Sequence, residues 1–280
     1  MTTIKAALAL ATQRLEESPS ARLDSELLLA YILQKERTYL YAYEANLLTQ
    51  EQNARFDQLI AARSEGHPIA YLVGQREFWS LSFKVTEATL IPRPETELLV
   101  EQALILLADK PHAKVLDMGT GSGVVALSCG HEQPNWEIDA CDCSISALTV
   151  AEENAKQLGI NNVRFYQSEW FDRLDKSRQF DAILSNPPYI ALNDEHLTKG
   201  DLRFEPRLAL ASGKDGLDAI QVLVEAGQSW LKPGGWLCME HGYEQKEIVQ
   251  SMLRKYNYKQ IDSWYDGQGH ARITAGRRME

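Results

Sequence analysis

Apolar side chains recur every three to four positions through the first 73 residues, which is the spacing of amphipathic helices. Helices are expected at Ile4 to Ala11, Ala21–Leu33 and Tyr39 to Glu44, and another after Thr49 to Gln52, which resembles a helix start. We therefore expect residues 1–75 to form a small helical bundle that, by analogy with other helical appendages, docks a substrate. The side chains expected in its core include Leu23, Leu27, Leu28, Ala30, Tyr31, Tyr39, Tyr41 and Tyr43.

The period of the pattern changes to two between residues 76 and 92. Apolar and polar side chains alternate from Phe78 to Val85, and many of them favour strands, which predicts a β-hairpin. The prolines of the segment Ile91 to Glu97 then stiffen the chain, and its two glutamates are expected to open a helix, because the N-terminal dipole favours acidic residues. We treat residues 76–92 as a hairpin linker between two domains.

Strand and helix patterns alternate from Lys114 onward. This alternation predicts βαβ units with a parallel sheet, so residues 93–280 are expected to form a doubly wound α/β domain. The expected strands are Val115–Met118, Glu137–Cys143, Val163–Tyr166, Phe180–Ser185 and Trp236–Glu240, with two closing strands near 259–265 and 271–276. The expected helices are Val124–Cys129, Ser146–Leu158, Asp218–Leu231 and Gln245–Lys255.

Composition narrows the class of protein. With 280 residues, 44% hydrophobic and 24% charged, the chain can bury a sizeable core. It has no apolar stretch of the roughly 18 residues that a membrane span needs and no signal-peptide pattern at its start, so we expect a cytoplasmic protein. Of the four cysteines only Cys141 and Cys143 are close in sequence, and no second pair completes a metal set. Free buried thiols and no metal are therefore expected.

The net charge is acidic and is distributed unevenly along the chain. The formal net charge is −10, with 9 Lys and Arg against 11 Asp and Glu in residues 1–90, and 20 against 28 in residues 91–280. Enzymes that act on nucleic acids usually carry a basic footprint. The sequence therefore argues against stable nucleic-acid binding.

A glycine-rich turn follows the first strand of the α/β domain, in Asp117-Met118-Gly119-Thr120-Gly121-Ser122-Gly123. Glycines at alternate positions allow a tight turn that brings a ligand against the start of the next helix. The dinucleotide fingerprint G-x-G-x-x-G would need a glycine where this chain has Val124. The spacing suits a ligand with an amino-acid tail and no pyrophosphate, such as S-adenosyl-L-methionine (SAM). A turn that serves packing alone is the alternative.

Two more strand ends carry residues suited to a nucleoside. Asp142 ends the second strand, where a carboxylate can accept hydrogen bonds from both hydroxyls of a ribose. Trp170 follows the third strand and can cover an adenine ring. A helix N-cap for Asp142 and a core role for Trp170 are the alternatives. With the glycine turn, these residues favour a nucleotide-like ligand.

The strand Phe180–Ser185 ends in Asn186-Pro187-Pro188-Tyr189. The two prolines have no N–H to donate, so a central strand must stop here, and each holds the preceding residue extended. Because this strand end is expected beside the cofactor pocket, the tetrapeptide should face the group that is methylated. A strand that merely ends in a proline-rich turn is the alternative.

The chemistry of this tetrapeptide suits a planar nitrogen. An amide or exocyclic amine is a poor nucleophile, because its lone pair is delocalised. Asn186 Oδ1 and the Pro187 carbonyl can accept its two N–H groups, holding the nitrogen in line with the sulfonium methyl and favouring the charge that develops on it. Tyr189 offers a flat face for stacking, and no general base is required, since the alkylated nitrogen loses its proton to water. Asn186, Pro187 and Tyr189 are therefore the predicted catalytic residues.

These motifs resemble those of the HemK-type release-factor glutamine methyltransferases, and the resemblance covers nearly the whole chain. Met118 stands where Leu is common in the family, a change that conserves volume. The other segments that carry the resemblance are Arg22-Leu23-Asp24, Pro68 to Leu72, Arg76 to Trp79, Ile91 to Glu97 and Arg203 to Pro206.

The resemblance implies SAM-dependent methylation of the side-chain amide nitrogen of the glutamine in the Gly-Gly-Gln motif of class 1 peptide chain release factors. It also implies a Rossmann-like seven-stranded methyltransferase sheet whose last strand is antiparallel, and a helical domain that helps to dock the release factor. Carried over to this chain, Gly119, Thr120, Gly121, Ser122, Gly123, Asp142, Trp170 and Asn186 would bind SAM, and Asn186, Pro187, Pro188 and Tyr189 would hold the glutamine.

Three other functions are the alternatives. An adenine-N6 methyltransferase acting on DNA or RNA would need a basic groove or a recognition domain. A nicotinamide-dependent oxidoreductase would leave Asn186 to Tyr189 unexplained, and a non-catalytic adaptor would not need intact motifs. A monomer is expected. The sequence assigns no role to Arg93, Glu95, Arg203, Phe204 and Glu205, which could be packing and cap residues.

Overall fold

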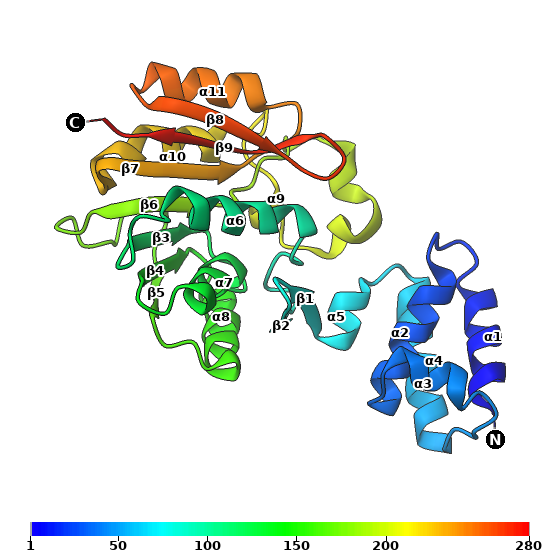
Figure 1. Cartoon of the computed structure of the whole chain (residues 1–280). Helices are drawn as coiled ribbons and strands as arrows, with labels where there is room; N and C mark the ends of the chain where they lie inside the picture. The colour runs from blue at the N-terminus through cyan, green and yellow to red at the C-terminus, as the bar shows by residue number, and fades with distance from the viewer. Residues whose placement is uncertain (1, 280) are drawn as a thin grey trace. The chain divides into compact units, whose positions relative to one another are not determined.

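The computed structural model describes residues 2–279 and divides into two compact units, with the boundary between Gln75 and Arg76 (Figure 1). The smaller unit contains the helices α1 to α5. The larger unit contains a seven-stranded sheet with helices on both faces.

The smaller unit is a bundle of short helices. Its helices α1, α2 and α4 pack around a shared apolar core that includes Leu28, Leu29, Phe56 and Ile60. Four of the five lie where the helical spacing predicts them, whereas the last was not expected. The bounds are α1 Ile4–Arg14, α2 Ala21–Leu33, α3 Arg37–Ala42, α4 Gln50–Ser64 and α5 Ile69–Val73.

The start of α4 is a capping box. The Thr49 hydroxyl accepts a hydrogen bond from the backbone N–H of Gln52 at 3.1 Å, and the Gln52 side chain accepts one from the Thr49 N–H at 2.9 Å. Both donors would otherwise lack partners at the helix end. The helix start predicted from Thr49 to Gln52 is therefore confirmed.

The prediction of which α2 side chains face inward is partly wrong. Leu23 is 41% exposed, whereas Glu26 is only 1% exposed. Glu26 can be buried because Arg22, Arg37 and the Tyr41 hydroxyl all donate hydrogen bonds to it. The core position predicted for Tyr41 is also wrong, since its ring is exposed and only its hydroxyl reaches inward; Tyr43 is exposed as well.

The predicted hairpin is present as β1 (Gln75–Phe78) and β2 (Leu81–Lys84). Its two turn residues, Trp79 and Ser80, have φ of 52° and 57°, which is the backbone geometry of a two-residue hairpin turn. The strained Trp79 is fixed by two hydrogen bonds of 2.8 Å, from its backbone N–H to Glu97 and from its indole N–H to Glu132. Phe78 and Phe83 are buried in the core of the larger unit.

The sheet of the larger unit has the strand order β5-β4-β3-β6-β7-β9-β8. The first five of these strands are parallel, and β9, the last along the chain, is antiparallel to both of its neighbours. This is the predicted seven-stranded Rossmann-like methyltransferase sheet. The strands are β3 Lys114–Met118, β4 Glu137–Asp142, β5 Val163–Gln167, β6 Phe180–Ser185, β7 Leu231–Glu240, β8 Lys259–Tyr265 and β9 Ala271–Arg277.

Helices cover both faces of this sheet (Figure 1). Those on one face are α6 Glu97–Leu106, α7 Val124–Glu132 and α8 Ile145–Leu158, and those on the other are α10 Asp218–Trp230 and α11 Lys246–Lys255. The long connection from β6 to α10 contains only short turns of helix. These are η2 Glu195–Thr198, η3 Gly200–Phe204 and α9 Arg207–Leu210, and the shorter η1 Pro94–Thr96 precedes α6.

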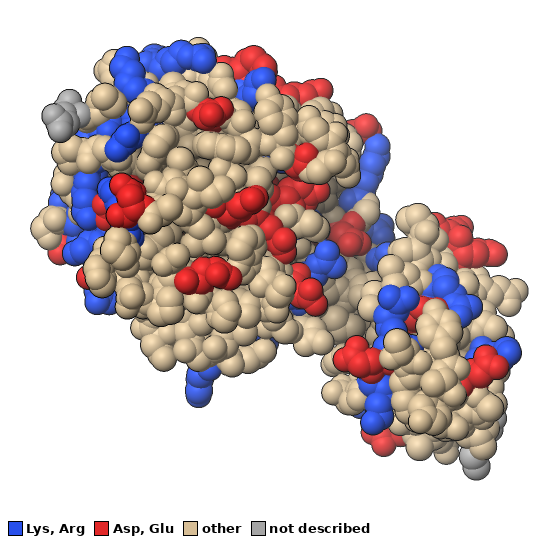
Figure 2. All heavy atoms as spheres, in the orientation of Figure 1, with Lys and Arg blue, Asp and Glu red and all other residues tan. Residues whose placement is uncertain are grey.

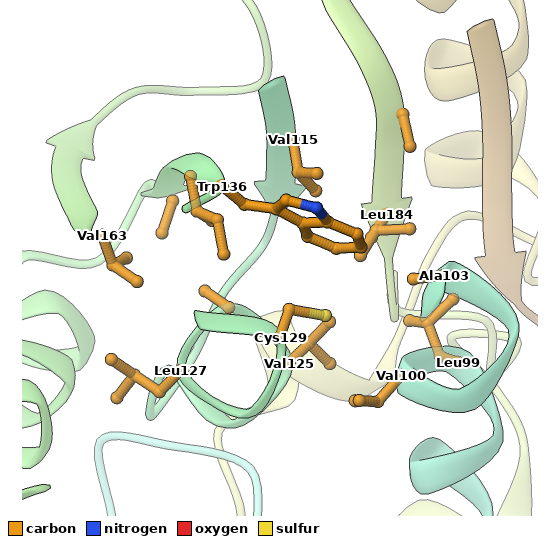
Figure 3. Close-up of a cluster of buried hydrophobic side chains, with 14 of the residues drawn as sticks. Leu99, Val100, Ala103, Val115, Val125, Leu127, Cys129, Trp136, Val163 and Leu184 are labelled. Carbon is orange, nitrogen blue, oxygen red and sulfur yellow. The ribbon is translucent and has the colours of Figure 1, made fainter. Parts of the chain in front are cut away.

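Alternate side chains of the buried strands enter two separate apolar cores, as the period of two requires. Val115 and Leu184 belong to the core under α6 and α7, whereas Leu116 and Ile183 belong to the core under α10 and α11. Figure 3 shows the first core, with Trp136 among Val115, Leu184 and Cys129. The buried strands are thus packed by apolar side chains on both faces of the sheet.

The expectation for the cysteines is partly wrong. Cys129, Cys141 and Cys238 are buried free thiols, but Cys143 is exposed, because β4 ends one residue before it. No helix among residues 2–279 combines the length and apolarity that crossing a membrane requires.

Candidate active site

The carboxyl ends of the parallel strands enclose a cavity of about 440 Å³ in the larger unit. The chain passes from β3 to β4 and β5 on one side and returns to β6 on the other, so β3 and β6 form the switch point of the sheet. Ligands of open α/β sheets bind at such a point. Of the predicted site residues, the cavity is lined by Gly119, Thr120, Gly121, Ser122, Asp142, Trp170, Asn186 and Pro188.

The glycine turn needs glycine for two different reasons. Gly119 and Gly121 have φ of 76° and 56°, and a Cβ on either would meet no atom within 4 Å, so only the backbone conformation requires glycine there. At Gly123, with φ of 85°, a Cβ would lie 2.9 Å from Leu127 Cδ1. Gly123 does not line the cavity within the described chain. The structure thus shows one reason for glycine at this position, the close packing of α7.

The Asp117 side chain, near the end of β3, supports the glycine turn through hydrogen bonds. Its Oδ2 accepts hydrogen bonds from the Thr120 hydroxyl at 2.6 Å and from the backbone N–H of Ala126 at 3.1 Å. Burial raises the pKa of Asp117 to about 6, against the lowering effect of both hydrogen bonds. The carboxylate thus joins the turn to the first turn of α7.

Asp142 is held in place by backbone donors on both of its oxygens. Oδ2 accepts from the Gly121 N–H and Oδ1 from the Ser144 N–H, each at 2.9 Å. A carboxylate has about four lone-pair sites, so each oxygen retains one for a ligand. Asp142 therefore also organises the glycine turn, a role that the sequence did not suggest.

Trp170 lines the cavity in a strained backbone conformation. Its φ is 48°, in the left-handed region that a bulky residue rarely adopts. Strain of this kind persists where the surrounding structure imposes it and is common at functional sites. The ring packs against the core that contains Leu116 and Ile183, so the predicted core role and the ligand role are compatible.

The tetrapeptide after β6 divides between the cavity wall and the scaffold behind it. Asn186 and Pro188 line the cavity, whereas Pro187 and Tyr189 do not among the described residues. The Tyr189 hydroxyl donates to Glu240 Oε1 at 3.1 Å, and burial, followed by the charge of Glu240, raises the pKa of Tyr189 far above its usual range. Its side chain is thereby held as part of the scaffold.

Thr96 and Glu240, which the sequence analysis did not single out, lie behind Asn186 and are linked to it by hydrogen bonds. The Asn186 amide nitrogen donates to the Thr96 hydroxyl at 3.0 Å, and that hydroxyl donates to Glu240 Oε2 at 2.7 Å. Burial raises the pKa of Glu240, against the hydrogen bonds from Thr96 and Tyr189. A signal for Glu240 was present, since it is an acid at the carboxyl end of an apolar strand. Thr96 had no signal of that kind, although it lies in the segment Ile91 to Glu97, which carries the family resemblance.

The segment before α6 is tied to the connection after β6 by a buried ion pair. Glu205 accepts hydrogen bonds from Arg93 and, at 2.9 Å, from the Ile91 N–H. Burial raises the pKa of Glu205, against the charge of Arg93. Arg93 lines the cavity, so the pair joins two of its walls. In addition, the Arg203 guanidinium lies 4.8 Å from the centre of the Phe204 ring.

The donor set of the site is not that of a metal centre. Across residues 2–279, His, Cys, Asp and Glu side chains form no group of three or more that could hold a metal ion. The cavity instead combines backbone turns, the Asp142 carboxylate, the Trp170 indole and the Asn186 amide, and the carboxylates of Asp117, Glu169 and Asp218 also line it. Fold and site together define a Rossmann-like methyltransferase.

Comparison with known proteins agrees with this class. Residues 95–200 match the family model described as a methyltransferase small domain, and residues 6–74 match the model of a PrmC N-terminal domain. Among solved structures, a ribosomal protein L11 methylase from Lactobacillus delbrueckii is 22% identical with a TM-score of 0.51, covering 67% of this chain and 81% of that one. A methyltransferase from Pyrococcus furiosus is 16% identical with a TM-score of 0.52, covering 83% and 100%. These likenesses show the fold.

Sequence relatives narrow the class to one family. A release factor glutamine methyltransferase of Salmonella typhimurium is 45% identical over 267 residues, which are 95% of this chain and 96% of the relative. Another, of Coxiella burnetii, is 46% identical over 261 residues, 93% of each chain. The chain belongs to the release factor glutamine methyltransferase family.

Proposed function

We propose that this protein transfers a methyl group from SAM to the side-chain amide nitrogen of a glutamine, the one in the Gly-Gly-Gln motif of class 1 peptide chain release factors. The observation that carries the proposal is that Asn186 and Asp142 line one cavity, so an amide clamp and a ribose-binding carboxylate face the same space. The names of the relatives supply the release factor as the protein substrate.

The residues of the cavity fit SAM. A volume of about 440 Å³ lies within the range of small-molecule sites, roughly 300 to 1,000 Å³. Asp142 keeps an acceptor site on each oxygen for the ribose hydroxyls, and the half-buried Trp170 ring can cover the adenine. The turn from Gly119 to Ser122 leaves room for the amino-acid tail, since no side chain fills the space at Gly119 or Gly121.

Asn186 and Pro187 position the acceptor nitrogen. Asn186 Oδ1 and the Pro187 carbonyl accept the two N–H groups of the glutamine amide, and Pro188 and Tyr189 hold this pair in place. When bound, SAM supplies a methyl group activated by its sulfonium. As the N–C bond forms and the C–S bond breaks, positive charge develops on the nitrogen, and the two oxygens stabilise it. The nitrogen then releases its extra proton to water.

The smaller unit, whose residues 6–74 match the model of a PrmC N-terminal domain, is proposed to dock the release factor, by analogy with other helical appendages that hold a substrate. The proposed place of action is the cytoplasm, where release factors work, and the proposed form is a monomer.

Methylation of adenine in DNA or RNA is the second candidate, because the same tetrapeptide can clamp an exocyclic amine. The charge distribution argues against it. The chain has a net charge of −10, and on the face of the larger unit that Figure 2 shows, Asp and Glu lie across the middle while Lys and Arg lie mostly near the margin. A nucleic-acid groove would need the opposite arrangement.

The test is methyl transfer from labelled SAM to a purified class 1 release factor. We expect incorporation of one methyl group, which mass spectrometry assigns to the glutamine of the Gly-Gly-Gln motif. A release factor in which this glutamine is replaced by alanine should stay unlabelled. Equal labelling of that variant, or labelling of an adenine oligonucleotide only, would refute the proposal.

The control for the clamp is Asn186→Ala. This variant should lose most turnover while it still binds SAM, as measured by calorimetry. Unchanged turnover would show that Asn186 does not act on the glutamine.

A further inference from the structure

Three hydrogen bonds connect Asn186 and Tyr189, which the proposed reaction uses, to Thr96 and Glu240, which have no role in it so far. Asn186 Nδ2 donates to Thr96 Oγ1, Thr96 Oγ1 donates to Glu240 Oε2, and the Tyr189 hydroxyl donates to Glu240 Oε1. The lengths are 3.0, 2.7 and 3.1 Å. Each carboxylate oxygen of Glu240 thus accepts one hydrogen bond, Oε2 from the Thr96 hydroxyl and Oε1 from the Tyr189 hydroxyl.

The fold places these groups together from three separate elements. Ser185 of β6 is in register with Met239 of β7, so Asn186 and Glu240 both follow that pair at the same edge of the sheet. Thr96 ends η1, at the start of α6. Thr96 and Glu240 are buried, at 3% and 1% exposure. Such burial keeps water from competing for these hydrogen bonds.

When Glu240 is ionised, and so only accepts, the pattern of donors and acceptors along these three hydrogen bonds allows only one orientation of the Asn186 amide. A hydroxyl has one hydrogen, and that of Thr96 is committed to Glu240, so Thr96 can offer only a lone pair to Asn186. The amide end that faces Thr96 must then be Nδ2, and Oδ1 lies at the other end. Because Asn186 lines the cavity, Oδ1 is the end left for a ligand.

We propose that Thr96 and Glu240 are positioning residues that fix the orientation of the Asn186 amide, so that its oxygen and not its nitrogen meets the N–H group of the methyl acceptor. This inference rests on the proposed function and deepens it. If the amide were turned over, the Asn186 NH2 group would face the N–H group of the nitrogen that is methylated. Both groups are hydrogen-bond donors, so this nitrogen would lose one of its two hydrogen bonds. Selectivity for an amino or amide nitrogen over an oxygen acceptor follows from the same orientation.

The test is Thr96→Val, which removes the hydroxyl at nearly constant volume. We expect kcat for release-factor methylation to fall by about tenfold or more, while the dissociation constant for SAM changes by less than about threefold, because only the orientation of the amide is lost. Thr96→Ser retains the hydroxyl and should restore kcat to within about threefold of the parent value. An unchanged kcat in Thr96→Val would overturn the proposal.

A double-mutant cycle separates positioning from general damage. In an Asn186→Ala background, Thr96→Val should reduce kcat by less than about twofold, because the group that Thr96 orients is absent. Full additivity of the two effects would refute the mechanism. The matched control is Thr149→Val, which removes an exposed hydroxyl that bonds only to its own helix and should leave kcat unchanged.

A second variant and the activity of the parent protein separate the positioning role of Thr96 from misfolding and from failure of the proposed function. If Thr96→Val does not fold, Thr96→Ala removes the same hydroxyl without adding bulk, and wild-type kcat in that variant would equally overturn the proposal. A parent protein that labels no release factor would contradict the proposed function. An active parent with an equally active Thr96→Val would contradict only the positioning role.

Discussion

At the scale of single residues, Asp117 shows how burial and hydrogen bonding compete. One of its oxygens accepts from both Thr120 and Ala126, which fixes the turn that carries the glycines. Burial nevertheless raises its pKa from 3.8 to about 6. The ionised form is therefore less favourable in the folded chain than in the unfolded chain.

This raised pKa predicts a pH dependence of stability. The contribution of Asp117 is fully present below about pH 4 and is lost as the pH rises through about 6, a change of roughly 3 kcal/mol at about 1.4 kcal/mol per pKa unit. Asp117→Asn keeps an acceptor oxygen but cannot ionise. Its stability relative to the parent should thus increase between pH 4 and pH 7, as measured by urea unfolding at each pH. Parallel stability curves for the two proteins would show that the pKa of Asp117 is not raised.

At the scale of elements, the connection from β6 to α10 is what holds the acceptor side in place. Ile190 is paired with Ala211 in a parallel bridge, and the Gln245 side chain donates to the Tyr189 carbonyl at 3.1 Å. The backbone of Gly216 lies against the same carbonyl. With φ of 80°, a Cβ on Gly216 would stand 2.1 Å from the Tyr189 oxygen.

A methyl group at Gly216 should therefore displace the tetrapeptide. We expect Gly216→Ala to lower kcat for release-factor methylation by between about 10-fold and 100-fold, because a shift of about 1 Å in a positioning group has effects of that size. The measurement is steady-state methylation together with the melting temperature.

The matched control is Gly269→Ala. Gly269 has nearly the same φ, 81°, but a Cβ there would meet no atom within 4 Å. Both variants should therefore bear similar backbone strain, of roughly 1–2 kcal/mol, and only the first should lose turnover. Equal kcat values for the two variants would contradict the displacement of Tyr189.

At the scale of the whole molecule, buried carboxylates of the two units differ in the direction of their pKa shift. Burial dominates for Asp117 of the larger unit, whereas hydrogen bonds dominate for Glu26 of the smaller unit. Glu26 is a buried charge of the smaller unit, and it accepts hydrogen bonds from Arg22, Arg37 and the Tyr41 hydroxyl. Burial alone would raise its pKa, but these donors outweigh burial and lower the pKa to about 2. The stabilisation is present above about pH 4.5 and is lost as the pH falls towards 2.

Glu26→Gln should destabilise the smaller unit at neutral pH by roughly 1–3 kcal/mol, the cost of weakening buried hydrogen bonds to charged groups. Hydrogen exchange of the full chain is the measurement. Amides of α1, α2 and α4 should exchange faster, while those of β3, β6 and β7 keep their protection. Glu44→Gln, in an exposed ion pair with Lys5, is the control and should change exchange little. Faster exchange throughout both units would contradict independent stabilisation of the smaller one.

Local patterns in the sequence determined the framework of this protein. The helical spacing before residue 73, the hairpin alternation and the strand–helix alternation after Lys114 led to the observed elements, because each depends on neighbouring residues only. The glycine turn, Asp142, Trp170 and Asn186 were recognisable for a related reason. Each stands at or just after a strand end, and strand ends of a parallel sheet gather at one edge.

Only the tertiary structure determined which buried groups form hydrogen bonds with those residues. Thr96 and Asn186 are 90 positions apart, and Thr96 and Glu240 are 144 apart, so no local pattern relates them. The same holds for Glu205 with Ile91, and for the inward position of Glu26 in place of Leu23. A buried polar group is tolerated only where the fold brings it donors or acceptors from elsewhere. The sequence thus indicated most of the predicted side chains that line the cavity, and the fold determined which buried groups hydrogen-bond to Asn186.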